Sequence, residues 1–251
     1  MKRVGKVSGW MAGLMASLLS SCLWIPQKPV TPVRTLSDEP PEKPKQLVVM
    51  LPGRWSKPEE FQRELLMEMA RKHWPQARIV APNLHLGYYT NRVAVERLHE
   101  DVILPAEREG VKEIIVVGVS MGGLGALIYD LEHPGKIDRM ILLSPFVGDE
   151  EAIREIDAAG GVRSWKPGVI EEKDFSRKLW VGLKQEWLGQ RKRPEIVLAC
   201  GDKDRLRASN ERFSKDFLKP NEVISLPGDH DWPTWRTAFG KILGGGSNRL
   251  R

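Results

Sequence analysis

The sequence has little cysteine and no grouping of residues typical of a metal site. Cys22 and Cys200 are the two cysteines among 251 residues, so at most one disulfide could join them. None of the five histidines has a second histidine four positions away, and no Cys/His cluster is present. This pattern argues against a bound metal, and no cofactor is implied.

A concentrated stretch of basic residues is also missing. The formal net charge is +6, and half of it corresponds to Lys2, Arg3 and Lys6 at the N-terminus. Elsewhere no run of lysine and arginine is interleaved with aromatic residues, and no internal repeat is found. The composition therefore gives no support for a nucleic-acid-binding protein.

The apolar run near the N-terminus is short. Residues 7–19 make 13 apolar or small positions, whereas a membrane-spanning helix needs about 20. A short apolar core behind basic residues predicts a signal peptide over residues 1–21, although a signal anchor is an alternative.

The residues that end this run, Leu19-Ser20-Ser21-Cys22, resemble the lipobox of bacterial lipoproteins. The resemblance implies cleavage before Cys22, lipidation of Cys22, and a domain anchored by lipid in the bacterial envelope, facing the periplasm or the exterior. In such lipoproteins an Asp directly after the lipidated Cys is a retention signal. This chain has Leu23 at that position, which favours the outer membrane. The alternative is a plain secretory signal, in which case Cys22 and Cys200 could form a disulfide; otherwise Cys200 is expected to be a small buried hydrophobe.

Beyond this leader the chain divides into a linker, a domain and a tail. Six prolines within residues 26–44 predict a Pro-rich tether over residues 22–45. The folded domain is expected over residues 46–243 and a disordered tail over residues 244–251.

Apolar runs of strand length alternate with segments of helical periodicity in the domain. Strands are expected at residues 47–51, 77–81, 114–117, 138–144, 195–200 and 222–226, and helices at 58–72, 91–109, 124–131, 209–218 and 232–243. This alternation predicts an α/β fold, a doubly wound and mainly parallel sheet covered on both faces.

The segment IIVVGVSMGGLG, residues 114–125, carries the most specific motif. An apolar strand runs into a tight turn with Ser120 at its tip, and a helix follows. Gly118 and Gly122 supply the small neighbours that so sharp a turn requires. We interpret Ser120 as the nucleophile of an elbow, facing the free N–H groups of the helix start.

With these elements, residues 47–243 resemble the α/β-hydrolase family. In that family a Ser, an acid and a His follow successive strands in this order, which implies Asp204 as the acid and His230 as the base here. Asp204 fits the family spacing after Gly201 better than Asp202, which is expected to stabilise the turn. The His would deprotonate the Ser, and the carboxylate would orient the imidazole.

The resemblance also implies two backbone N–H donors for an oxyanion hole. One is Met121, directly after the nucleophile, and the other is Arg54 or its neighbour Trp55. Here the chain departs from the common pattern, because Pro52 stands where many relatives have His. Trp55, His85 and Tyr88 are further candidates for substrate contact; alternatively, Trp55 is a core-edge aromatic and His85 bonds to loop backbone.

Residues 145–194 interrupt the strand–helix rhythm, where relatives insert a lid. This segment is expected to be a small cap with three tryptophans, Trp165, Trp180 and Trp187. They either form the wall of an acyl pocket or pack the cap onto the sheet.

The sequence thus predicts a serine hydrolase that cleaves a small-molecule carboxylic ester or thioester through an acyl-serine intermediate. A peptidase or amidase and an acyltransferase are alternatives on the same scaffold, since fold does not fix substrate. A non-catalytic envelope lipoprotein is the alternative from another class.

Overall fold

The computed structural model describes residues 27–189 and 191–246, which build one seven-stranded sheet in the order β1-β3-β2-β4-β5-β6-β7. All neighbouring pairs are parallel except β1 with β3. The predicted α/β class with a mainly parallel sheet is confirmed. The strands are β1 (Thr35–Asp38), β2 (Gln46–Leu51), β3 (Ala77–Pro82), β4 (Glu113–Val119), β5 (Arg139–Leu143), β6 (Glu195–Gly201) and β7 (Val223–Leu226).

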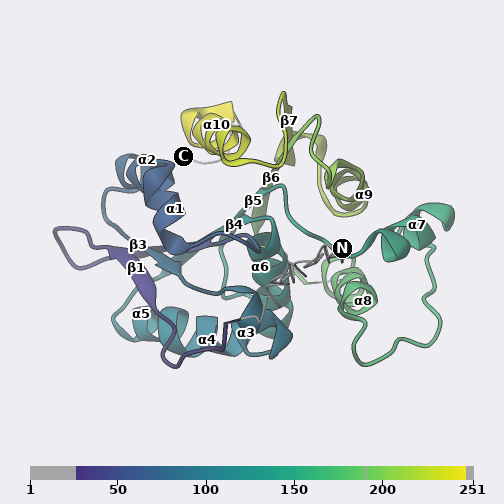
Figure 1. Cartoon of the computed structure of the whole chain (residues 1–251), viewed down its shortest axis with the longest axis horizontal. Helices are drawn as coiled ribbons and strands as arrows, with labels where there is room; N and C mark the ends of the chain where they lie inside the picture. Colours follow the sequence, from purple (N-terminus) through teal and green to yellow (C-terminus); the bar gives the residue numbers. More distant parts are fainter. Residues whose placement is uncertain (1–26, 190, 247–251) are drawn as a thin grey trace, which may run out of the picture.

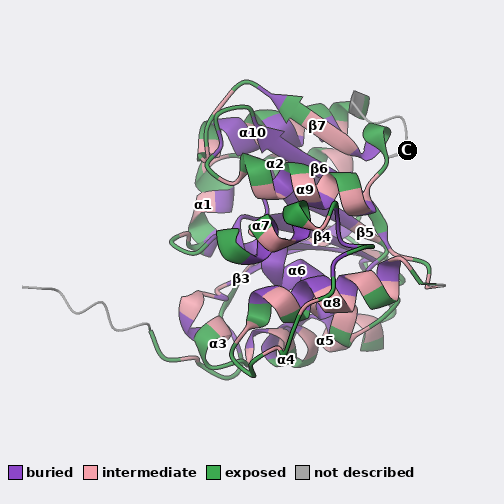
Figure 2. Cartoon of the chain, turned by 90° about the vertical axis from the view of Figure 1, so that its right-hand side faces the viewer, coloured by how far each residue is buried: buried purple, intermediate pink, exposed green. Residues whose placement is uncertain are grey.

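Helices cover both faces of the sheet, because its central strands are apolar on both sides. One apolar cluster packs one face against α1 (Pro58–Arg63), α2 (Leu66–His73) and α10 (Trp232–Lys241). The other cluster packs the opposite face against α3 (Leu86–Thr90), α4 (Ala94–Leu98), α5 (Leu104–Arg108), α6 (Met121–Glu132), α7 (Glu150–Ala158), α8 (Phe175–Trp187) and α9 (Arg207–Phe217). Figure 1 shows α1, α2 and α10 on one side and α3 to α6 on the other. In Figure 2 buried residues concentrate on the strands and the inner helix faces.

Two of the predicted helices are broken. The helix expected at residues 58–72 is two helices, α1 and α2, because Leu65 between them adopts the left-handed region at φ 65°. The helix expected at 91–109 consists of α4, a π-helical turn over His99–Ile103, and α5. Pro105 near the start of α5 lacks the N–H that an uninterrupted α-helix would use there.

The predicted tether over residues 22–45 is wrong for the part that the structure describes. Residues 27–38, the N-terminal strap, lie on the domain, and their last four form β1, paired with β3 from Thr35↔Pro82 to Asp38↔Ile79. Val33 is buried, and its N–H donates to Oδ2 of Asp101 at 2.8 Å. The domain therefore begins well before residue 46.

Several sequence predictions fall beyond the described residues. The signal peptide over residues 1–21, Cys22 and residues 247–251 all lie outside them. Of the tail predicted from residue 244 onward, the first residues belong to a π-helical turn, Ile242–Gly246, that follows α10. In the described ranges no helix combines the length and apolar character needed to cross a bilayer.

The cap, residues 145–194, connects β5 to β6 and contributes α7 and α8. Its three tryptophans are all buried. The indole N–H of Trp180 donates to the carbonyl of Val147 at 2.7 Å, and that of Trp187 donates to Oδ2 of Asp130 at 2.9 Å. One contact lies within the cap and the other joins it to α6, so of the two roles considered the contacts support packing of the cap.

Candidate active site

A strained turn presents Ser120 between β4 and α6. Its backbone has φ 51° and ψ −113°, a conformation that a residue with a side chain rarely adopts. The two flanking glycines are required sterically. A Cβ at Gly118 would lie 2.7 Å from the backbone of Gly123, and one at Gly122 would overlap the carbonyl of Leu51. The turn thus has the geometry of a nucleophile elbow.

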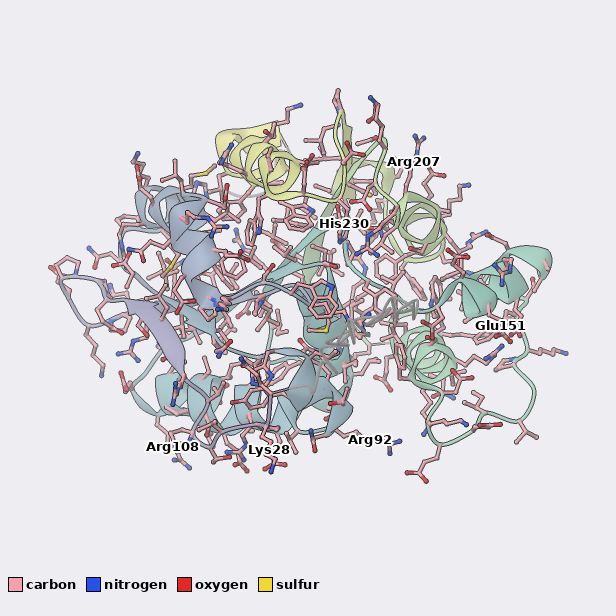
Figure 3. All side chains as sticks on the ribbon, viewed as in Figure 1. Lys28, Arg92, Arg108, Glu151, Arg207 and His230 are labelled. Carbon is pink, nitrogen blue, oxygen red and sulfur yellow. The ribbon has the colours of Figure 1, made fainter. Side chains whose placement is uncertain are left out.

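His230 reaches Ser120 from the loop between β7 and α10. Its Nε2 lies 2.9 Å from Oγ of Ser120. The imidazole is fixed from the side by Trp235, whose ring packs edge-on at a centroid distance of 5.0 Å. Asp231 caps α10 by accepting the N–H of Thr234 at 3.0 Å, which holds the loop. Figure 3 shows His230 between α10 and α9.

Asp204, in the loop after β6, is the third residue of a hydrogen-bonded row that runs from Ser120 through His230. Both of its carboxylate oxygens lie 2.9 Å from Nδ1 of His230, and Oδ1 also accepts the N–H of Leu206 at 2.7 Å. Its side chain is fully buried, and this burial alone would raise the pKa of the carboxyl. The hydrogen bonds that the carboxylate accepts, chiefly the one from His230, outweigh the burial, so the pKa of Asp204 is lowered and the group stays ionised.

Asp202, the alternative acid, has a different partner. Its Oδ1 accepts the N–H of Gly228 at 3.1 Å and thereby ties the loop after β6 to the loop after β7. This is the turn-stabilising role expected from the sequence.

The loop that follows β2 lies directly beside the elbow. A Cβ placed on Gly53 would be 3.5 Å from Cβ of Ser120. The turn is closed by the N–H of Ser56, which donates to the carbonyl of Gly53 at 3.1 Å, so Pro52 does not prevent it from forming. Arg54 and Trp55 are exposed here, and the guanidinium lies 5.0 Å above the indole ring. On the other side of Ser120, Met121 begins α6, so its N–H has no acceptor within the helix.

The two candidates from the loop after β3 have structural partners. Nδ1 of His85 accepts the N–H of Gly87 at 3.1 Å as the N-cap of α3, and burial lowers the pKa of this imidazole. Tyr88 is buried, and its hydroxyl both accepts from the N–H of Val30 and donates to the carbonyl of Val30, each at 2.9 Å. The predicted substrate contact of Tyr88 is therefore not supported, while His85 serves the loop backbone, as the alternative interpretation had it.

Sequence reasoning missed the segment that follows β5. Ser144 is buried with φ 46°, and the N–H of Phe146 donates to the carbonyl of Ser120 at 2.9 Å. Asn210 supports the same segment by donating to the carbonyl of Pro145 at 2.9 Å. Phe146 braces the elbow through its main chain, Asn210 holds the segment through its side-chain amide, and the sequence carries no local signal for either contact.

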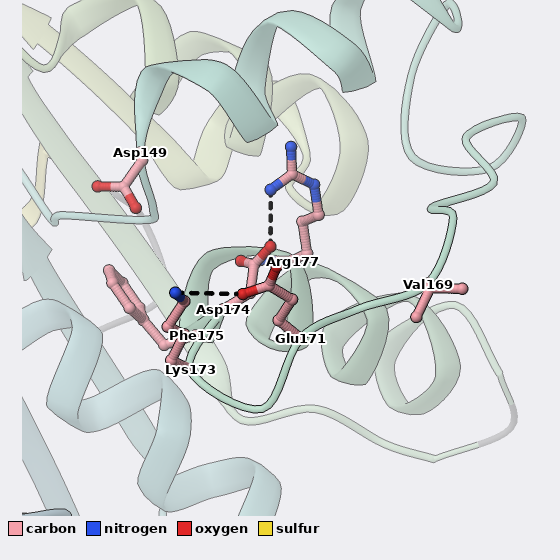
Figure 4. Close-up of a pocket in the computed structure, with 7 residues that line it drawn as sticks. All are labelled: Asp149, Val169, Glu171, Lys173, Asp174, Phe175 and Arg177. Atoms are coloured by element: carbon pink, nitrogen blue, oxygen red, sulfur yellow. Dashed lines mark hydrogen bonds and ion pairs between the residues drawn. The ribbon is translucent and has the colours of Figure 1, made fainter.

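A cleft of about 390 Å³ opens in the cap next to this segment. Its lining comprises Asp149, Val169, Glu171, Lys173, Asp174, Phe175 and Arg177 (Figure 4). Two ion pairs, Lys173–Glu171 and Arg177–Asp174, make it polar. Phe175 connects it with the elbow, since its ring lies 6.0 Å from that of Phe146.

No metal chemistry is suggested by the part of the chain that the structure describes. Within residues 27–189 and 191–246, no three His, Cys, Asp or Glu side chains are grouped so that they could hold an ion.

Comparison with solved structures finds the same fold in serine hydrolases. An S-formylglutathione hydrolase from Staphylococcus aureus is 20% identical, with a TM-score of 0.56 over 82% of this chain and 81% of that one. A fluorophosphonate-binding serine hydrolase from S. aureus is 16% identical, with a TM-score of 0.57 over 84% and 91%. Est1E from Butyrivibrio proteoclasticus is 17% identical, with a TM-score of 0.56 over 86% and 93%. No curated protein sequence matches significantly.

The family comparison is more specific than the fold. The model of the Esterase family, described as "Putative esterase", matches residues 104–245, more than half of the chain. This segment contains Ser120, Asp204 and His230. The chain therefore belongs to the Esterase family, and it is a serine ester hydrolase with the α/β-hydrolase fold.

Proposed function

We propose that this protein hydrolyses a carboxylic ester or thioester in two steps, through an acyl intermediate on Ser120. The observation that carries the proposal is the continuous hydrogen-bonded row from Asp204 through His230 to Ser120. A serine hydroxyl is a weak nucleophile until a base removes its proton, and this row supplies the base in position.

In the first step Oγ of Ser120 attacks the carbonyl carbon while Nε2 of His230 takes its proton. Asp204 holds the Nδ1–H of the ring and stabilises the imidazolium. The negative charge that develops on the carbonyl oxygen faces the N–H of Met121 and a second N–H from the Arg54–Trp55 loop. The intermediate then collapses, and His230 returns the proton to the departing alcohol or thiol.

In the second step a water molecule replaces the leaving group. His230 removes a proton from the water as its oxygen attacks the acyl carbon, and the same proton passes to Ser120 when the acid is released. All proton transfers use residues of this chain, so the reaction needs no cofactor.

The comparisons support both substrate classes. One neighbour of the same fold is a hydrolase of S-formylglutathione, a thioester, and Est1E has been solved with ferulic acid bound. An amidase would require attack on a less reactive carbonyl by the same residues, and an acyltransferase would pass the acyl group to an acceptor other than water. Rates on matched esters, thioesters and anilides, with product analysis, separate these three activities.

We also propose that the protein is anchored in a bacterial envelope. The lipobox-like Leu19-Ser20-Ser21-Cys22 supports anchoring by a lipidated Cys22 in a bacterial envelope, with the outer membrane favoured. Mass spectrometry of the mature protein tests this directly: an acylated Cys22 at the N-terminus is expected, and an unmodified Cys22 would contradict it.

Hydrolysis of short p-nitrophenyl esters by the wild type and by Ser120→Ala tests the chemistry. We expect a loss of about 10³-fold or more in kcat with an unchanged circular dichroism spectrum. Parental rates in the variant would refute the assignment. The wild type would show no hydrolysis at all if the protein were a non-catalytic lipoprotein.

A further inference from the structure

Large apolar side chains that remain exposed are few among the described residues, and they are not scattered evenly. Five are exposed by 41% or more: Val30, Trp55, Leu65, Val169 and Phe175. Trp55 lies in the loop directly after the carboxyl end of β2, Val30 contacts α3 after β3, and Val169 and Phe175 lie in the cap after β5. We refer to Val30, Trp55, Val169 and Phe175 as the apolar rim.

Contacts tie three rim residues to the surroundings of the nucleophile. Trp55 belongs to the loop of Gly53, which abuts Ser120. Phe175 packs near Phe146, whose N–H bonds to the carbonyl of Ser120. Val169 lines the same cleft as Phe175 and is fully exposed (Figure 4).

The fourth rim residue, Val30, belongs to the N-terminal strap, which passes over α3. A Cβ at Gly87 would overlap the carbonyl oxygen of Gln27, so the two backbones touch. Two hydrogen bonds between Val30 and the hydroxyl of Tyr88 fasten the strap at this point. Because α3 follows the carboxyl end of β3, the strap reaches residue 27 at the same edge as the active site. Figure 2 shows the first described residues beside α3.

The distance from this docked point to the predicted lipid anchor is short. Four residues separate Cys22 from Gln27, and even a fully extended chain spans no more than about 18 Å over that interval. A lipid on Cys22 therefore keeps Gln27, and with it the carboxyl edge, close to the bilayer surface. A free tether running from Cys22 to residue 45 would have imposed no such limit.

We propose that the apolar rim rests on the lipid bilayer that holds Cys22, so that the active site opens toward the lipid–water interface and takes ester substrates from it. This inference rests on the lipid anchor of the proposed function. Trp55 with Arg54 stacked on it is the combination of amphipathic side chains favoured at interfaces. Lys28 and Arg54 are exposed basic residues close in sequence to Val30 and Trp55, which suits anionic headgroups. The carboxylates beside Val169 and Phe175, those of Glu171 and Asp174, are paired with Lys173 and Arg177.

The test measures which part of the protein touches lipid. The full-length chain, produced in bacteria with its leader, is reconstituted in vesicles of phosphatidylethanolamine and phosphatidylglycerol. An environment-sensitive nitrobenzoxadiazole dye is attached to Val169→Cys or, as the matched control, to Leu65→Cys. Both positions are exposed, whereas Cys200 is buried and protected from labelling. We expect a blue-shifted emission quenched by doxyl lipids at position 169 and a water-like emission at position 65.

Flotation with the vesicles and the dye emission together separate a failure of this inference from a failure of the proposed function. If the protein floats with the vesicles but the dye at position 169 stays water-like, the rim does not face lipid and the inference is overturned, while the anchor stands. If the protein does not float, anchor and inference both fall, while hydrolysis of a soluble ester by Ser120 is unaffected.

A second measurement uses activity. The variant Val30→Asp places charge in the rim without touching the core or the cleft in the cap. We expect a several-fold lower rate on an ester embedded in the vesicles and an unchanged rate on a short soluble ester. Leu65→Asp is the control and should alter neither rate, since Asp tolerates the left-handed backbone at this position. Equal effects of the two substitutions on the embedded ester would overturn the inference.

Discussion

Nε2 of His230 lies 2.9 Å from Oγ of Ser120, although 110 positions separate the two residues in the chain. The contact arises because parallel strands β4 and β7 deliver both residues to the same edge of the sheet. Asp204, delivered by β6, fixes the far side of the imidazole. The base thus already lies at hydrogen-bonding distance from the nucleophile.

Replacing Asp204 by Asn should impair catalysis far more than replacing Asp202. A neutral amide in place of the Asp204 carboxylate would favour the wrong tautomer of His230, so we expect kcat to fall by about 10³- to 10⁴-fold. Asp202→Asn keeps an oxygen that can accept the N–H of Gly228, and its rate should stay within a few-fold of the wild type. Steady-state hydrolysis of a p-nitrophenyl ester measures both. The reverse order of effects would make Asp202 the catalytic acid.

Asp204 should also contribute a pH-dependent part of the stability. Its folded-state pKa is lowered from the ordinary value of 3.8, so the unfolded chain binds a proton more readily than the folded one. The contribution is complete above about pH 4 and is lost as the pH falls through the folded pKa. Urea denaturation between pH 6 and pH 3 should therefore show the stability gap between wild type and Asp204→Asn narrowing at the acid end. A gap that widens there would contradict the assigned ionisation.

The elbow should not tolerate a methyl group at Gly122. Its Cβ would overlap the carbonyl of Leu51, and the shift needed to relieve this should cost about 1–3 kcal/mol of stability and most of the activity. Gly168→Ala is the matched control, because no atom lies within 4 Å of its added Cβ. Thermal denaturation and ester hydrolysis report the two effects. Normal stability and activity in Gly122→Ala would mean that the elbow is packed less tightly than described.

The N-terminal strap should add measurably to stability. Val33 is 5% exposed and Val30 is 46% exposed, so their truncation removes very different packing. We expect Val33→Ala to lower the free energy of unfolding by about 1–3 kcal/mol and Val30→Ala to change it by less than about 0.5 kcal/mol. Urea denaturation of the full-length protein measures this. Equal, small effects would indicate that the strap is not docked in solution.

Local patterns in the sequence were sufficient to predict the central strands of the sheet and the order of strands and helices along the chain. The run from Ile114 to Val117 is apolar at every position, as a strand buried on both faces must be, and the small residues around Ser120 define the turn after it. The roles of Asp204 and His230 were predicted from the resemblance to a family. Local sequence could not predict them, because the two loops converge as a result of strand order.

The parts that sequence reasoning missed depend on long-range contacts. β1 lies in a proline-rich segment whose strand character comes from pairing with β3. From the sequence alone, Tyr88 in the segment after β3 could have faced substrate. Its contact with Val30, 58 positions away, decides its role. The bracing of the elbow by Phe146 uses backbone groups, so its side chain gave no indication of it.

The most direct measurement of the central claim is the site of covalent reaction with a fluorophosphonate probe. The wild-type protein is labelled and digested, and the modified residue is identified by mass spectrometry, with Ser120→Ala and His230→Ala in parallel. The arrangement of Asp204, His230 and Ser120 predicts a single adduct on Ser120, none in Ser120→Ala, and strongly slowed labelling in His230→Ala. Labelling of Ser120→Ala at the parental rate, or an adduct on another serine in the wild type, would contradict it.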